Sequence, residues 1–393
     1  MKKISTIFLL STFLISTGAT ASLNNIYSII QQQFTPQQHK VENSYLNTLD
    51  LESPYRCKID GGHNKNISTT IPVNLNDFKL SKTTPSDPMP RFEVNGYTFK
   101  NQALDEALQT LVDEAGISVY TQDRVYPTLS AKNVYGDLES VVEALSKNGE
   151  VFYSYNEAAK KLYISRQADF TISLPKNRLV ILGVLDALRG AGVENIVTDW
   201  HQGVLRLTLS RAEEKTVKDL IESIQSNGEM LVADTQTYQL NSVADWRKII
   251  YEYGHNNVFS ATNGLQGKLL VLNNSAKSNS FLNTVQKTSI AHLTSEGISV
   301  VPNGWRMFFD ISKCGIKDSQ APHVSLSINP KMDSESKINA LITLNAQQGE
   351  ISSFNVTASL NDELAIIGIP NIAVGGELLI LVKLKLIRLV GEN

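Results

Sequence analysis

The sequence predicts an α+β protein, in which two small modules of the βαββα type are followed by a β-rich C-terminal domain. Three observations predict this class. Apolar residues recur at helical spacing twice in each of two consecutive stretches, short strand-like runs separate those helices, and period-two alternation takes over towards the C-terminus. The boundaries that these patterns indicate divide the chain into 1–21, 22–90, 91–166, 167–228 and 229–393.

The N-terminus has the features of a cleavable signal peptide. Lys2 and Lys3 precede an apolar run over residues 4–15, and small residues then lead to Ala21, just before Ser22. A positive start, a short apolar middle and an A-x-A exit are typical of secretory signals, so cleavage is expected between Ala21 and Ser22. The apolar run is shorter than the about 20 residues that a membrane-spanning helix needs. The sequence therefore predicts export.

Residues 22–90 are polar and are expected to be an N-terminal segment and linker. The segment ends in Thr84-Pro85-Ser86-Asp87-Pro88-Met89-Pro90, whose prolines disfavour both helices and central strands. Folded structure is expected to begin at Phe92.

The stretch 91–166 predicts the first module. A strand near Phe92 is followed by a helix that ends at Gly116, two strands, a second helix that ends at Gly149, and a terminal hairpin. Apolar positions three and four apart indicate the helices. They are Ala103, Leu104, Ala107, Leu108, Leu111 and Val112 in the first helix, and Leu138, Val141, Val142 and Leu145 in the second.

The stretch 167–228 predicts the second module. A strand over 169–174 leads into an apolar helix, a hairpin that turns at Gly203, and a second helix that ends at Gly228. In the second hairpin strand, Leu205, Leu207 and Leu209 alternate with other residues and are expected to face the core.

The stretch 229–393 is dominated by predicted strands. Two of them are candidate barrel or ring strands because their apolar residues share one face: Phe354, Val356, Ala358 and Leu360 in the first, and Val382, Leu384 and Leu386 in the second. A strand with one apolar and one polar face fits an antiparallel sheet packed on a core, or the wall of a barrel that faces lipid or a lumen.

These segments resemble one family of proteins. The motifs Leu104-x-x-Ala107-Leu108-x-x-Leu111 and Leu138-x-x-Val141-Val142-x-x-Leu145 resemble the short N-terminal domain shared by secretins and signalling TonB-dependent receptors. The stretch 169–228 is similar to the KH-like ring-building domains of secretins. Residues 324–330, 354–368 and 377–382 resemble strands of the secretin domain itself. The chain is thereby identified as a short and divergent member of the secretin family.

The resemblance implies a secretin-like subunit of an outer-membrane ring or channel, with its N-terminal modules in the periplasm. It implies a task in type IV pilus assembly, with the type IVb class preferred, or in type II or type III protein secretion. The implied partners are identical subunits in a homo-oligomeric ring, the outer membrane, inner-membrane secretion or pilus platform proteins, and an exported pilin or protein substrate. The C-terminal strands would pair between neighbouring subunits and so remove their exposed edges.

Two alternatives stay open. The segment 369–376 is short where the family carries a longer loop, which also fits a non-pore periplasmic scaffold ring of an envelope complex. The first module alone would suit a periplasmic signalling or binding module.

The composition argues against other classes of function. The 393-residue chain carries a net charge of −3 without a basic block, so nucleic acid is not expected as a partner. Histidines and acidic residues form no metal-ligand or catalytic motif, so neither an enzyme nor a cofactor is expected. Cys57 and Cys314 would meet an oxidising compartment, and they are either a candidate disulfide or two isolated thiols.

Overall fold

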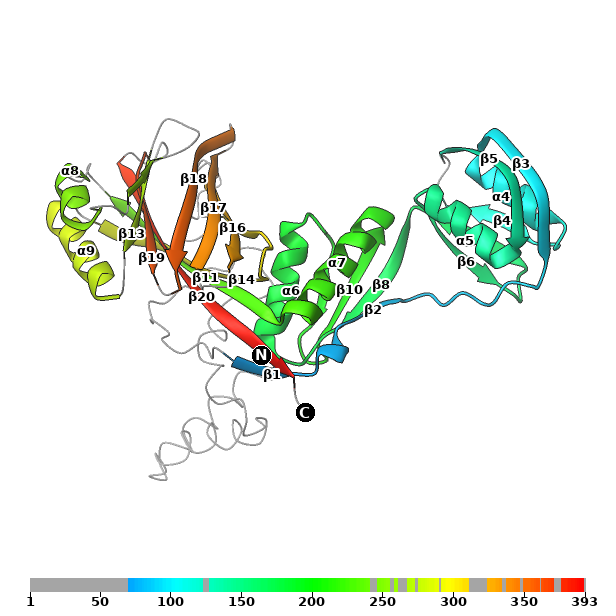
Figure 1. Ribbon diagram of the computed structural model, residues 1–393, viewed down its shortest axis with the longest axis horizontal. Helices are drawn as coiled ribbons and strands as arrows, with labels where there is room; N and C mark the ends of the chain where they lie inside the picture. Colours follow the sequence, from blue (N-terminus) through cyan, green and yellow to red (C-terminus); the bar gives the residue numbers. More distant parts are fainter. Residues whose placement is uncertain are drawn as a thin grey trace, which may run out of the picture. The chain divides into compact units, whose positions relative to one another are not determined.

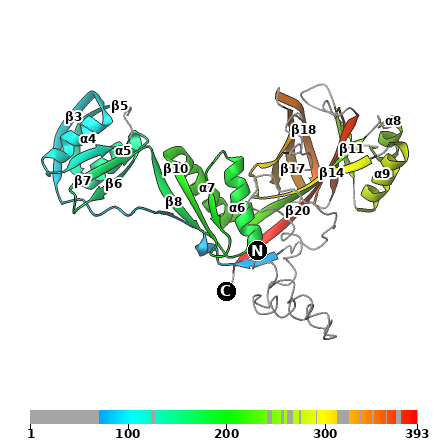
Figure 2. The ribbon, with the colours of Figure 1, turned by 180° about the vertical axis from the view of Figure 1, so that it is seen from behind.

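The protein is described from a computed structural model (Figures 1 and 2). The structure describes residues 70–122, 127–240, 246–254, 258–260, 267–272, 275–289, 291–310, 324–333, 337–346, 349–360, 362–370 and 376–391. Both helices and strands contribute, so the α+β class predicted from the sequence is confirmed. Within the described ranges, no helix is both long enough and apolar enough to cross a membrane.

The first module has the order of elements that the sequence predicted. They are β3 (Glu93–Ala103), α4 (Leu104–Asp113), β4 (Ser118–Thr121), β5 (Thr128–Asp137), α5 (Leu138–Asn148), β6 (Phe152–Asn156) and β7 (Lys161–Ser165). β3 pairs with β5, while β4, β7 and β6 form a second sheet. Except for Ala103, which ends β3 and lies outside the core, the helix positions expected to face inward share one buried core, which includes Leu104 and Leu108 of α4 and Leu138 of α5.

The second module is a four-stranded antiparallel sheet with two helices. Its elements are β2 (Lys79–Lys82), β8 (Gln167–Ser173), α6 (Arg178–Gly190), β9 (Val197–Asp199), β10 (Val204–Ser210) and α7 (Arg211–Asn227), in the sheet order β2-β8-β10-β9. Leu205, Leu207 and Leu209 are buried, as their alternation predicted. α7 begins with a capping box between Ser210 and Glu213 and ends at Gly228, which is left-handed.

In its described residues, the C-terminal part forms two sheets. The first has seven strands: β1 (Thr70–Val73), β11 (Glu229–Leu240), β12 (Val258–Ser260), β13 (Lys268–Leu272), β14 (Ala291–Pro302), β19 (Glu363–Pro370) and β20 (Glu377–Gly391). Its order is β12-β13-β19-β20-β11-β14, and β1 joins β20. The second sheet has four strands in chain order: β15 (Met307–Asp310), β16 (Val324–Met332), β17 (Lys337–Ala346) and β18 (Gly349–Ser359).

Helices and the smaller sheet lie on opposite sides of the seven-stranded sheet (Figure 1). The helices are α8 (Trp246–Ile249), which continues as the π-helical η2 (Ile250–Gly254), and α9 (Ser275–Thr288). Phe281 and Val285 of α9 pack with Leu379 and Leu381 of β20. Across the sheet, Phe354 of β18 reaches the glycine at position 267, just before β13. Both faces of the larger sheet are therefore buried at its centre.

The prediction that folded structure begins at Phe92 was wrong. Within the expected linker, β1 pairs in parallel with β20, and β2 pairs antiparallel with β8. Ile71, Val73 and Phe78 are buried, the last beside the 3-10 turn η1 (Leu75–Asp77), and Met89 lies in the first module's core. β1 and β2 each have only four residues within a polar stretch, and an alternating pattern of that length is too short to indicate a strand. Both become strands through partners far away in the sequence.

Two glycines allow α6 to pack closely against residues that follow the second module. A Cβ atom on Gly183 would collide with the side chain of Met230. A Cβ atom on Gly190 would lie 2.6 Å from the backbone oxygen of Arg306. The absence of a side chain at these two positions therefore lets α6 pack against β11, β14 and the segment just before β15.

α7 carries a buried carboxylate between two cations. The side chain of Glu214 is 11% exposed and accepts hydrogen bonds from Arg211 Nη1 at 3.1 Å and Lys218 Nζ at 2.7 Å. Burial by itself would raise the pKa of Glu214. The hydrogen bonds and charges of Lys218 and Arg211 outweigh this effect and hold that pKa below its ordinary value.

Gly190→Ala is expected to destabilise the protein by about 1–3 kcal/mol, because the new methyl group meets a backbone oxygen that cannot rotate away. This loss should appear although alanine is the better helix former. Chemical denaturation measures the free energy of unfolding. Gly391→Ala is the control, since its added Cβ meets no atom within 4 Å. Equal stability of the two variants would contradict the close packing of α6.

Glu214→Gln is expected to lower the free energy of unfolding by about 1–2 kcal/mol at neutral pH, where the charged carboxylate holds both cations. Because the folded-state pKa is lowered, the contribution of Glu214 is present above its unfolded pKa of about 4.3 and disappears as the pH falls through the folded value. The free energies of unfolding of the wild-type protein and of Glu214→Gln, measured by denaturation at several pH values, should therefore converge at acidic pH. Glu143→Gln, which breaks the exposed pair with Lys147, should cost much less. A stability difference between the wild-type protein and Glu214→Gln that stays constant with pH would contradict this role of the charge.

Candidate functional site

The four-stranded sheet β15–β18 is the candidate assembly surface. Each of its strands pairs antiparallel with the next one along the chain. β15 and β18 are the outer strands, and in the described part of the chain each has one partner strand. The sheet therefore ends in two edges whose backbone groups can accept another strand.

The two faces of this sheet differ in polarity. The inner face is apolar and buried, and it includes Leu326, Ile328, Ile338, Ile342, Leu344 and Phe354. The outer face is mainly polar and exposed, and it includes Asn329, Lys331, Asn339, Asn355, Thr357 and Ser359. On it, Thr357 Oγ1 donates a hydrogen bond to Asn339 Oδ1 at 2.6 Å. The inner face is thus committed to the core, while the outer face meets water at these residues, although Ser327 and Ser353 on the same face are buried.

The first candidate strand from the sequence lies at an edge of this sheet. Phe354, Val356 and Ala358 of β18 are buried on the inner face, so their shared orientation was predicted correctly. Leu360 lies in the turn after β18 and is partly exposed. The prediction that it continues the strand was wrong, because the chain already turns there towards β19.

The second candidate strand lies inside the larger sheet. Val382 and Leu384 of β20 are buried, and Leu386 is partly buried. β11 pairs with β20 along one side, and β19 pairs with residues 377–383 on the other. Over residues 377–383, which include Val382, β20 has partner strands on both sides and therefore no edge to offer a neighbouring subunit, contrary to the expectation from the sequence.

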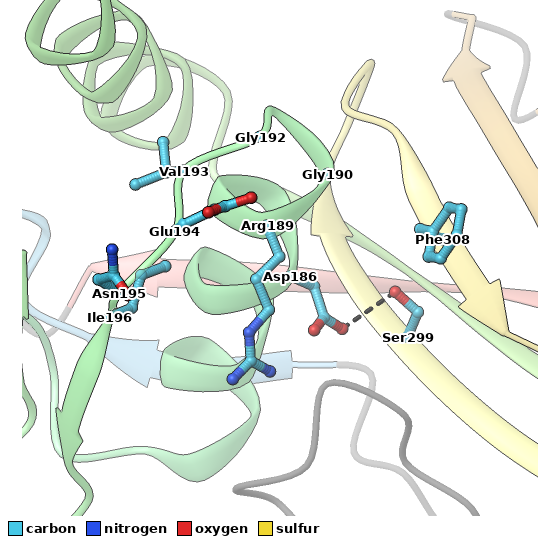
Figure 3. Close-up of a pocket in the computed structure, with 10 residues that line it drawn as sticks. All are labelled: Asp186, Arg189, Gly190, Gly192, Val193, Glu194, Asn195, Ile196, Ser299 and Phe308. Carbon is cyan, nitrogen blue, oxygen red and sulfur yellow. Dashed lines mark hydrogen bonds between the residues drawn. The ribbon is translucent and has the colours of Figure 1, made fainter. Parts of the chain in front are cut away.

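A pocket of about 480 Å³ lies beside β15 (Figure 3). Asp186 of α6 points across it to β14, where its Oδ2 atom accepts hydrogen bonds from Ser299 Oγ and Val300 N, both at 3.0 Å. A carboxylate thereby accepts a hydrogen bond from a backbone N–H group of β14, which lies at one end of the described seven-stranded sheet. The other lining residues are Arg189, Gly190, Gly192, Val193, Glu194, Asn195, Ile196 and Phe308.

Sequence reasoning did not single out this pocket. Phe308 is 45% exposed on the edge strand β15, and Val197, which follows the lining residue Ile196, is 66% exposed on the edge strand β9. One signal was available: Asp186 is the only charged residue among the apolar positions 179–188 of α6. A charge in an apolar helix needs a partner, but only the fold shows that this partner is the backbone of β14.

Several predicted residues lie outside the described residues. These are the cleavage-site residues Ala21 and Ser22 and the candidate disulfide pair Cys57 and Cys314, which stay predictions. Within the described ranges, no group of three or more His, Cys, Asp and Glu side chains is placed to hold a metal ion.

Comparisons with known proteins found no matching protein-family model and no matching curated protein. Among solved structures, the chain is similar to the type IV competence pilus secretin PilQ of V. cholerae, with 10% identity, coverage of 74% of this chain and 99% of that chain, and a TM-score of 0.18. It is similar to the N-terminal domain of the secretin XcpQ from Pseudomonas aeruginosa, with 13% identity, coverage of 50% and 99%, and a TM-score of 0.15. For the type II secretin GspD from enteropathogenic Escherichia coli, identity is 11%, coverage is 52% and 83%, and the TM-score is 0.16. TM-scores this low do not establish a shared overall arrangement.

Asp186→Ala is expected to cost about 1–3 kcal/mol of folding stability, because the buried N–H group of Val300 loses its acceptor. Ser299→Ala removes only one of the two donors and should cost about 1 kcal/mol or less. Thermal or chemical denaturation of both variants measures the difference. If Asp186→Ala were no more destabilising than Ser299→Ala, the carboxylate would not be what joins α6 to β14.

Proposed function

We propose that this chain is a subunit of a homo-oligomeric, secretin-like ring in the bacterial cell envelope. The exported chain would assemble at the outer membrane with its two small modules in the periplasm. The ring would pass a type IV pilus or a secreted protein, a task that follows the sequence resemblance to secretins. The role is structural and not enzymatic.

The observation that carries this proposal is that the sheet β15–β18 has, in its described residues, an even number of strands. In an antiparallel sheet of four strands, the two outer strands run in opposite directions. When identical copies stand side by side in one orientation, β18 of one copy is therefore antiparallel to β15 of the next. Such a contact joins two different surfaces, and it closes into a ring when the rotation per copy divides a full turn.

The polarity of the sheet supports the same arrangement. The apolar inner face rests on the subunit's own seven-stranded sheet, so edge-to-edge pairing would extend a sheet whose core is already complete. The exposed outer face carries Asn339, Asn355 and Thr357, which would form part of a water-facing wall. The larger sheet, covered on both faces at its centre, would brace this wall.

The proposal is tested by a disulfide that can form only between copies. Phe308 and Asn355 lie on the same face of β15 and β18, with two strands between them. At a strand spacing of about 4.8 Å, the two edges of one copy are about 14 Å apart, which is too far for a disulfide. In a Cys57→Ser, Cys314→Ser background, the full chain with Phe308→Cys and Asn355→Cys should give a ladder of dimers, trimers and larger species on oxidation.

Each single-cysteine variant is the matched control, because one cysteine per chain permits nothing larger than a covalent dimer. Thr357→Cys in place of Asn355→Cys tests the alternative register, two residues along the same face. A double variant that remains folded and yields no species beyond the dimer in either register would contradict edge-to-edge assembly.

A non-conducting scaffold ring is the second candidate. β19 and β20 form a hairpin within the covered sheet, and Ile366, Ile367 and Ile380 are buried there. This hairpin therefore helps to build the covered sheet, which favours a bracing role. Conductance of purified rings in planar bilayers distinguishes the candidates: conducting rings support the channel, and rings without conductance support the scaffold.

A further inference from the structure

The last residues of β20 pair with β1, while Leu389 N also donates a hydrogen bond to the backbone oxygen of Gly228, just before β11. β11 pairs with β20 no further than the contact between Glu229 and Arg388. Beyond that point, in the described part of the chain, β1 is the strand that pairs with Leu389, Val390 and Gly391. Figures 1 and 2 show β1 along this end of β20. Without β1, the end of the longest described strand would present its backbone to other chains.

β1 is well suited to cover an edge without creating a new one. Ile71 and Val73 are 1% and 3% exposed, so one face of the strand is anchored in the protein. Thr70 and Pro72 are exposed on the other face. Proline contributes no N–H group, and a short strand that contains proline is a poor template for a further strand.

β1 can leave β20 without disturbing the residues that follow it. Gln225 Nε2 of α7 donates hydrogen bonds to the backbone oxygens of Leu75 at 3.2 Å and Phe78 at 3.1 Å. Phe78 is 2% exposed and holds the segment against the second module. Asn74 lies between this anchored turn and β1. Rotation about Asn74 would therefore open the edge of β20 while η1 and β2 stay in place.

We propose that β1 is an autoinhibitory strand, which covers the edge of β20 at Arg388–Gly391 and so prevents this edge from pairing with the same edge of a second copy of the chain. The proposal does not depend on the β15–β18 ring, because it concerns another sheet. It assigns to the segment before the first module the control of an association that the folded chain would otherwise permit.

The test uses the full chain with Val390→Cys in a Cys57→Ser, Cys314→Ser background, and a short bis-maleimide that joins nearby cysteines. Val390 is 48% exposed and lies opposite Pro72, so it reports when two β20 edges meet. Ile71→Asp places a charge in the buried site and should release β1, with a several-fold increase in covalent dimers. Thr70→Asp adds the same charge on the exposed face of β1, beside Arg388 of β20, and should not raise the yield. Equal yields from the two variants would overturn the proposal.

A locked variant keeps the test decisive if Ile71→Asp fails to fold. Thr70 and Arg388 are register partners on exposed positions, so Thr70→Cys with Arg388→Cys, in the same background, should form a disulfide that holds β1 closed. The oxidised form should self-associate several-fold less than the reduced form in sedimentation velocity experiments. If both forms associate equally, β1 is not inhibitory. Failure here leaves the Phe308–Asn355 ladder unaffected, so the two proposals can fail separately.

Discussion

β20 is the strand on which the C-terminal part of the protein depends. β11 pairs along one side, β19 and β1 pair along the other, and the side chains from Leu378 to Val382 are buried on both faces. These partners come from different parts of the chain, and β1 comes from before the first module. Because β20 is the last described element, the seven-stranded sheet can be completed only after its C-terminal strand is present. Pairing between strands that are far apart in the sequence slows folding.

The central position of β20 separates two tasks between the two sheets. The larger sheet is covered by α8 and α9 on one side and by the smaller sheet on the other. Asp186 accepts a backbone N–H group from β14, and β1 covers the end of β20. The smaller sheet keeps a polar outer face and two outer strands. In our interpretation, the larger sheet supplies stability and the smaller sheet supplies the contact between subunits.

The sequence predicted local structure well and tertiary roles less well. The helices of both small modules were predictable because positions such as Leu104, Leu108 and Leu111 repeat at helical spacing and are buried in the structure. The alternation of Phe354, Val356 and Ala358 gave the correct inner face of β18. No local pattern could show that β20 lies in the centre of a sheet while β18 lies at an edge, since alternation reports faces and not neighbours. β1 and β2 were not predicted from the sequence for a related reason: their partner strands lie far away along the chain.

The most direct test of the central proposal is the size of the native protein after gentle extraction from envelopes. Unboiled and boiled samples would be compared on a denaturing gel, and any large species would be imaged by negative staining. We expect a heat-sensitive multimer that appears as rings. A monomer or dimer that is released without detergent would contradict the ring and would leave a periplasmic protein built from the same modules.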